Sequence, residues 1–164
     1  MKMPFREMPP PDVAVAAGEK VLAWCRTTDG AVLAGTRDAL YLPDGRVPWE
    51  HVEAADWDRD TVVLRVSEVG AWGRPRPEHT FTLDEPRRLL ELVRERVTAS
   101  VVYQRHVPIR GRRGLRVIAR RAPSGREPIA WVYEYDETID PDDPGVREVA
   151  GRALAAARDE VGLP

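Results

Sequence analysis

The sequence predicts an α+β protein in which antiparallel strands are packed against two helices. Short apolar runs separated by turn residues fill most of the region from 20 to 83, and three more follow residue 100. Two segments, near 85–97 and after Asp143, have apolar residues at helical spacing. A chain of 164 residues makes one ordinary domain or two small ones, and it can bury a core without disulfides.

The first 83 residues are expected to form a proline-rich arm followed by strands. Residues 1–18 are rich in proline and predict a flexible arm that ends at Gly18. Pro43 and Gly45 indicate a tight turn, because proline fixes φ and glycine accepts a positive φ. The strands are expected at 21–27, 31–35, 37–42, 47–57, 61–67 and 79–83. The fourth of them is expected to break near Glu50.

A helix is predicted from about residue 85 to residue 97. Asp84 suits its N-cap and Pro86 its first turn, where the missing N–H of proline has no partner to lose. The apolar face of this helix consists of Leu89, Leu90, Leu92, Val93 and Val97. The segment 68–78 is rich in glycine, proline and arginine, and it is expected to form a long loop.

The second part of the chain is expected to form a three-stranded β-meander and a C-terminal helix. Alternating apolar residues predict its strands, which are expected at 100–109, 115–121 and 129–136. Asp143 and Pro144 start the helix in a cap-then-proline pattern, and Gly162 ends it.

The stretch from Thr36 to Asp58 (TRDALYLPDGRVPWEHVEAADWD) resembles the middle of bacterial PH-like domains. In those domains a strand is joined by a short turn to a Pro-x-x-x-Val segment, and a capping helix follows where this chain has its first helix. Over residues 18–162 the chain also resembles an uncharacterised family of actinobacterial proteins. That family shares Pro48-Trp49-Glu50 and a helix that runs into residues 94–100.

The resemblance to PH-like domains implies an antiparallel β-barrel or half-barrel over residues 19–99, capped by the helix. Residues 100–164 would then be a β-β-β-α extension, packed either separately or as one unit with the first part. PH folds imply a binding or scaffolding role, although a fold alone does not determine function. The uncharacterised family has no activity that could be transferred to this chain.

Motifs and composition give no indication of catalysis. The chain contains no GxGxxG, GxxxxGK[ST] or GxSxG motif. Its one cysteine, Cys25, lies in an apolar strand and is expected to be a small buried residue rather than a nucleophile. His51, His79 and His106 show no metal-ligand spacing. We therefore expect a protein without catalytic residues, metal ion or cofactor.

Four acidic residues cluster in the fourth expected strand: Glu50, Glu53, Asp56 and Asp58. Alternation places three of them on one face, so paired carboxylates are conceivable there. A solvated strand edge is the favoured interpretation, because proximity in sequence alone shifts no pKa.

No segment predicts export or membrane insertion. The apolar run from Val13 to Ala17 is shorter than the core of a secretory signal, and no run has the length of a membrane-spanning helix. The expected location is the cytoplasm.

Charge is unevenly distributed along the chain, although its net charge is only −2. Residues 105–126 hold eight arginines and no acidic residue, whereas residues 127–164 hold ten acidic residues and three arginines. The last two expected strands must share a core face, which requires an even sum of paired residue numbers. A sum of 250 places Arg116 opposite Glu134 and a sum of 252 places it opposite Asp136, so either register neutralises part of the basic segment.

Arg110, Arg112 and Arg113 lie in the expected turn without an acidic residue beside them in sequence. They are the candidate anion-binding residues, and the ligand they suggest is an RNA or DNA backbone. Base-specific recognition is disfavoured, because the chain has no asparagine and one glutamine. The alternative is an ordinary solvated surface.

The candidate partner-binding loop contains Trp72, Arg74 and Arg76. A tryptophan on such a loop is either a partner anchor or a stacking platform for bases, unless it folds back over the end of the barrel. The favoured hypothesis is a non-enzymatic binding or scaffolding module, whose protein or peptide partner meets this loop or an exposed sheet edge. The alternative function is nucleic-acid binding through the arginine turn.

Overall fold

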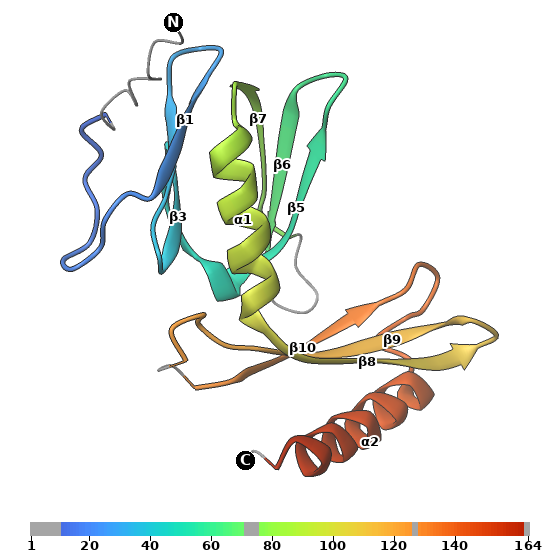
Figure 1. The fold of residues 1–164 in the computed structure, drawn as a ribbon. Helices are drawn as coiled ribbons and strands as arrows, with labels where there is room; N and C mark the ends of the chain where they lie inside the picture. The colour runs from blue at the N-terminus through green and yellow to red at the C-terminus, as the bar shows by residue number, and fades with distance from the viewer. Residues whose placement is uncertain (1–10, 71–75, 126–127, 163–164) are drawn as a thin grey trace, which may run out of the picture. The chain divides into compact units, whose positions relative to one another are not determined.

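A computed structural model describes residues 11–70, 76–125 and 128–162. The chain divides into two units, residues 1–98 and residues 99–164, and each is described by itself (Figure 1).

The first unit is built on one sheet of seven antiparallel strands. These are β1 (Ala23–Thr27), β2 (Val32–Gly35), β3 (Ala39–Leu42), β4 (Gly45–Pro48), β5 (Val52–Asp58), β6 (Val63–Glu68) and β7 (Glu78–Asp84). A 3-10 turn, η1 (Trp49–His51), separates β4 from β5, and helix α1 (Arg87–Ser100) follows β7. The strand order is β4-β3-β2-β1-β7-β6-β5, so β4 and β5 are the two edge strands.

The strands expected from the sequence are present, including the break near Glu50, but the sheet does not close into a barrel. β4 and β5 are consecutive in the chain and lie at opposite ends of the strand order. The reason is η1, in which Trp49 is fully buried and its side-chain Nε1–H donates to the Thr36 carbonyl at 2.9 Å. This anchored turn interrupts the strand expected over 47–57, so that β4 and β5 become separate edge strands that do not pair with each other.

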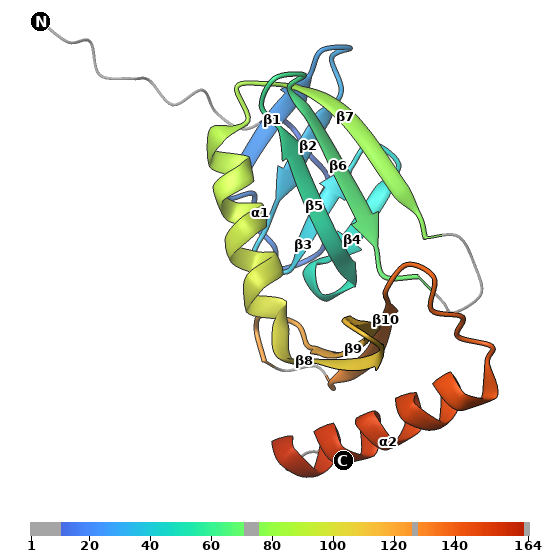
Figure 2. The ribbon, with the colours of Figure 1, turned by 90° about the vertical axis from the view of Figure 1, so that its right-hand side faces the viewer.

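Helix α1 packs on the apolar core of this unit and runs alongside the sheet (Figure 2). Leu89 and Val93 of the predicted apolar face are buried in the same cluster as Leu33, Leu40 and Trp49. Close approach depends on Gly35, because a Cβ there would lie 2.6 Å from Leu92 Cδ2.

The predicted N-cap of α1 is wrong. Asp84 is the last residue of β7, where it pairs with Arg26 of β1, and its carbonyl accepts a hydrogen bond from Cys25 Sγ at 2.9 Å. Glu85 then reverses the chain with a φ of 47°, and α1 begins at Arg87. The cap-then-proline pattern could not reveal that β1 holds the aspartate in the sheet.

The segment before β1 is attached to the sheet by Glu19. Its carboxylate accepts hydrogen bonds from Thr36 Oγ1 at 2.6 Å, Tyr41 Oη at 2.8 Å and Arg46 Nε at 3.1 Å. The Ala16 N–H donates to the same Tyr41 hydroxyl at 2.8 Å. Burial by itself would raise the pKa of Glu19, but the three hydrogen bonds outweigh it, and the pKa lies below its usual value. Of the arm expected over residues 1–18, residues 1–10 lie outside the described part.

Replacing Glu19 by glutamine should destabilise the first unit at neutral pH by about 1–3 kcal/mol, because an ionised acceptor of three donors is lost. A carboxylate with a lowered pKa stabilises the fold above its unfolded pKa, and this contribution is lost as pH falls through the folded one. Urea unfolding should therefore separate the variant from the wild type at pH 7 and bring them together near pH 3. A gap that is unchanged at pH 3 would show that ionisation is not the cause.

The second unit is a three-stranded antiparallel sheet with one helix against it. It contains β8 (Val101–Arg110), β9 (Arg113–Arg120), β10 (Ala130–Tyr135) and α2 (Pro144–Val161), with strand order β10-β9-β8. Asp143 caps α2 as predicted, since its side chain accepts from the Gly145 and Val146 N–H groups. Gly162 ends the helix in the left-handed conformation with a φ of 68°.

The register between β9 and β10 follows the index sum of 250, with Arg116 opposite Glu134 and Ile118 opposite Val132. Leu115 and Val117 are buried in a cluster with residues of α2 and with half-buried Tyr103, Trp131 and Tyr133. The sheet face that the alternation predicted is therefore the one that packs on the helix.

None of the helices in the described ranges has the length and apolar character needed to cross a membrane.

Candidate functional site

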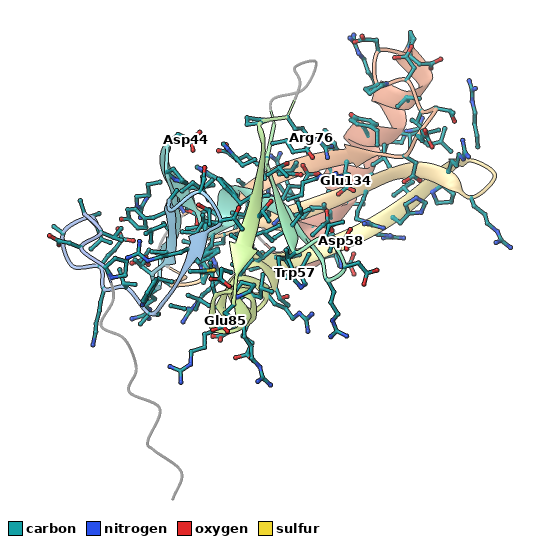
Figure 3. The ribbon with its side chains drawn as sticks, turned by 90° about the horizontal axis from the view of Figure 1, so that it is seen from above. Asp44, Trp57, Asp58, Arg76, Glu85 and Glu134 are labelled. Carbon is teal, nitrogen blue, oxygen red and sulfur yellow. The ribbon has the colours of Figure 1, made fainter. Side chains whose placement is uncertain are left out.

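The free edge of β5 is the longest unpaired strand edge in the first unit. β5 has seven residues, pairs with β6 on one side and has no strand on the other within the described sheet, whereas β4 at the opposite end has four residues and ends in Pro48. Ala55 and Trp57 of β5 are half-buried and pack against the core, with Trp57 beside Asp58 at one end of the strand (Figure 3). We call residues 54–58, with the side of their backbone that no strand covers, the β5 edge.

The acidic cluster of this region does not form a carboxylate pair. Glu50 lies in η1 rather than in the strand, and Glu53 forms an ion pair with Arg76. Asp58 accepts hydrogen bonds from the backbone of Thr61 and Asp60, which lower its pKa, so it holds the turn after β5. Asp56 is exposed opposite Arg65 of β6. The expectation of a solvated edge is confirmed for Asp56 and Asp58, which are exposed, but it is wrong for Glu53, whose side chain is only 9% exposed.

Only part of the candidate partner-binding loop can be placed. Trp72 and Arg74 lie outside the described residues. Arg76 is half-exposed, and its guanidinium is paired with Glu53 at the start of β5 (Figure 3). Arg76 is therefore connected to the start of β5 by an ion pair, which the sequence does not indicate because Glu53 and Arg76 are far apart in the chain.

The candidate anion-binding arginines lie together at the tip of the β8–β9 hairpin. Gly111 and Arg112 form its two-residue turn, with a φ of 61° at Gly111, as in a turn whose first central residue is glycine. Arg110 and Arg113 are opposite each other on either side of it. All three arginines are exposed. Arg113 donates to Thr138 Oγ1 at 3.1 Å, while Arg110 and Arg112 make no ion pair within the described residues.

The contact with Thr138 places an acidic loop beside this arginine hairpin. The loop between β10 and α2 carries Asp136, Glu137, Asp140, Asp142 and Asp143. Asp136 accepts from the Gly114 N–H at 2.7 Å and lies 2.7 Å from His106 Nε2, and these contacts lower its pKa. These acidic residues lie more than twenty positions further along the chain than the arginines, so their proximity could not be predicted from the sequence.

The rest of the basic segment is largely occupied within the second unit. Arg116 faces Glu134 across the strands, and Arg105 lies 3.7 Å from Glu160 of α2. Arg120 is buried and lies 3.4 Å from the Ser100 hydroxyl. Arg126 lies outside the described residues. The excess of positive charge that the sequence shows is therefore reduced by tertiary contacts.

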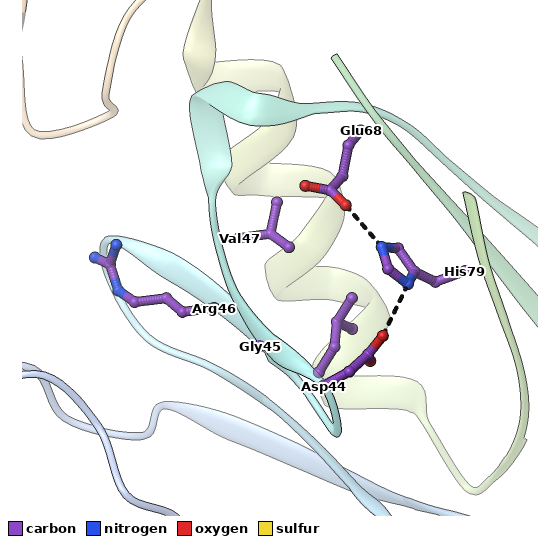
Figure 4. Close-up of a pocket in the computed structure, with 7 residues that line it drawn as sticks. Asp44, Gly45, Arg46, Val47, Glu68 and His79 are labelled. Atoms are coloured by element: carbon purple, nitrogen blue, oxygen red, sulfur yellow. Dashed lines mark hydrogen bonds and ion pairs between the residues drawn. The ribbon is translucent and has the colours of Figure 1, made fainter. Parts of the chain in front are cut away.

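A surface hollow of about 180 Å³ lies between the β3–β4 turn and strands β6 and β7 (Figure 4). It is lined by Leu42, Asp44, Gly45, Arg46, Val47, Glu68 and His79. Its polar centre is His79, whose Nε2 lies 2.7 Å from Glu68 Oε2 and whose Nδ1 lies 3.7 Å from Asp44 Oδ2. This cluster could not be predicted from the sequence, because its three members are separated by 24 and 11 residues and carry no local motif.

Cys25 is buried, as expected, and burial raises the pKa of its thiol. No group of three or more ligating side chains that could hold a metal ion occurs in the ranges described.

Comparison with known proteins found no matching family model, no matching curated protein and no matching solved structure.

Proposed function

We propose that this chain is a non-enzymatic binding module of the cytoplasm, with a PH-like first unit that takes up an extended peptide of a partner protein. The PH-like architecture is supported by the meander of seven antiparallel strands followed by a helix on their core, and by the resemblance of residues 36–58. The peptide site would be the β5 edge.

The observation that carries this proposal is that residues 54–58 of β5 pair with β6 on one side and with no strand of the described sheet on the other. An edge strand presents unpaired N–H and C=O groups, and an added strand satisfies them while side-chain pockets provide selectivity. β5 is long enough for this and has half-buried Ala55 and Trp57 on the core side. The exposed Asp56 favours a peptide with basic residues.

The test is a selection of random peptides on the full chain, followed by amide hydrogen exchange of the complex. Peptides that bind by strand addition should slow exchange at amides of β5 more than elsewhere in the sheet. The charge reversal Asp56→Arg should lower the affinity for basic peptides by about two- to fivefold, the size expected for an exposed charge pair. Asp159→Arg in α2 makes the same change of charge in the other unit and should leave the affinity unchanged.

Two results would contradict the proposal. One is selected peptides that protect residues outside β5, and the other is an equal loss of affinity in the two variants. A selection that yields no peptide at all above background would argue equally against a peptide-binding edge.

A second candidate function is binding of RNA or DNA phosphates by the arginine hairpin, which is favoured by the exposed Arg110 and Arg112 without ion-pair partners. Each arginine that contacts a phosphate adds about one unit to the slope of log affinity against log salt. Arg112→Glu should therefore weaken binding of a 20-nucleotide RNA and flatten that slope, whereas Arg152→Glu on α2 should not. A wild-type chain that binds no oligonucleotide at 50 mM salt would exclude this candidate.

A further inference from the structure

The hydrogen bonds between β6 and β7 determine which backbone groups of β6 point to β5. The Leu83 N–H donates to the Val62 carbonyl and the Glu68 N–H donates to the Pro77 carbonyl, both at 2.9 Å. In an antiparallel sheet, successive residues of a strand turn their N–H and C=O groups to opposite sides. The even-numbered residues of β6 therefore bond to β7, and the odd-numbered ones bond to β5, which lies on its other side (Figure 2).

The backbone groups on the open side of the β5 edge are those of Ala55 and Trp57. Residues 54, 56 and 58 lie opposite the odd-numbered residues of β6, so their N–H and C=O groups point to β6. The two residues between them point to the other side, where the described sheet has no strand. An added antiparallel strand can exchange a pair of hydrogen bonds with each of the two.

Asp56 is the charged side chain between these two open positions. It is exposed and forms no ion pair within the described residues, and Arg65 opposite it on β6 is paired with Glu78 at 2.9 Å. The carboxylate of Asp58 is already used, because it accepts hydrogen bonds from the backbone of the turn after β5. The residue of an added strand that lies opposite Asp56 forms a non-hydrogen-bonded pair, in which side chains approach most closely. A basic residue is therefore favoured at that position.

The two residues that flank the basic position place their side chains on the core side, beside Ala55 and Trp57. Both of these β5 side chains are half-buried and pack against the core. Alanine is small and tryptophan is large, and facing positions pack well when large and small side chains alternate. A large apolar residue is therefore favoured opposite Ala55, and a small residue is favoured opposite Trp57.

We propose that the β5 edge selects three consecutive peptide residues, in the order small, basic, large apolar from the N- to the C-terminal side. This inference rests on the proposed function, because it names the residues that the same edge recognises. The order follows from antiparallel addition, in which the residue after the basic one lies opposite Ala55 and the residue before it lies opposite Trp57. The flanking residues make the backbone hydrogen bonds, and the basic residue makes the charge pair with Asp56.

Backbone methylation of a selected peptide tests this arrangement. Short random peptides are selected on the full chain, and the tightest binder is made again with one N-methylated amide at a time. Methylation of either residue that flanks the basic one removes a hydrogen bond to β5 and should weaken binding about three- to tenfold. The N–H of the basic residue itself points away from β5, so its methylation is the matched control and should change the affinity less than about twofold.

The side-chain order is tested with two further exchanges. Exchanging the small and the large residue of the peptide should weaken binding about two- to fivefold. Replacing the basic residue by glutamate should weaken binding to the wild type and strengthen binding to Asp56→Arg by a similar factor. Asp60→Arg makes the same change of charge in the exposed turn after β5 and should give no such rescue.

The outcomes separate this inference from the proposed function. Peptides that protect β5 from hydrogen exchange can lose most of their affinity when the basic residue is methylated, bind equally well in the exchanged order, or show no rescue by glutamate. Any of these results would overturn the inference and leave peptide binding at the β5 edge intact. A selection without a peptide that protects β5 would overturn both.

Discussion

Gly114→Ala is expected to unfold the sheet of the second unit, with a loss of at least about 3 kcal/mol. A Cβ at Gly114 would overlap the Val107 carbonyl oxygen and lie 2.8 Å from Pro108 Cα, both on the neighbouring strand β8. These are backbone atoms, so no side-chain rotation relieves the overlap. The backbone of Gly114 also exchanges hydrogen bonds with Asp136, and moving it would break them. Amide hydrogen exchange of β8 and β9 should report the loss directly.

A second glycine of the same unit provides the control. Gly151 lies in α2 with no atom within 4 Å of an added Cβ, and alanine is the better helix former. Gly151→Ala should therefore stabilise the unit by about 0.5–1 kcal/mol. If Gly114→Ala leaves exchange in β8 and β9 unchanged, the close packing of these strands in the hairpin is not as described.

Trp49→Ala should remove about 3–5 kcal/mol from the stability of the first unit, a large share of what a small domain has. The side chain of Trp49 is completely buried between the sheet and α1, and its Nε1–H satisfies the Thr36 carbonyl. Removing it leaves a cavity beside Gly35 and an unpaired buried acceptor. Urea unfolding followed by far-UV circular dichroism measures the change.

Trp24→Ala is the matched control for this substitution. Trp24 is only half-buried and lies outside the core cluster, with Arg26 stacked on its ring at 5.7 Å. We expect less than half of the effect of Trp49→Ala, because the ring already contacts water. Equal losses in the two variants would contradict the argument that the extent of core burial determines the contribution of each indole.

Local patterns were sufficient to predict most of the elements of this protein. Alternating apolar residues identified the strands, and the need to place Val117 and Trp131 on one face left two registers of β9 and β10, of which the structure has the one with a sum of 250. The caps of α2 were predictable because Asp143 and Gly162 act within a few residues of themselves. Such patterns could not predict that the sheet stays open or that Asp84 belongs to β7.

Unlike the helices and strands, the candidate sites depend on contacts between residues that are far apart in the sequence. The arginine hairpin is visible in the sequence, but the acidic loop that lies beside it through Thr138 is not. The β5 edge exists because β5 is the last strand in the order of the sheet, which local sequence patterns do not show.

The sequence by itself determined where strands, turns and α2 lie, because these depend on periodicity and on residues that act on their immediate neighbours. The tertiary structure alone decided which charges meet: Glu19 with Tyr41 and Arg46, and His79 with Asp44 and Glu68. The physical reason is that an electrostatic contact depends on distance in space, and the folding of the whole sheet sets that distance rather than separation along the chain.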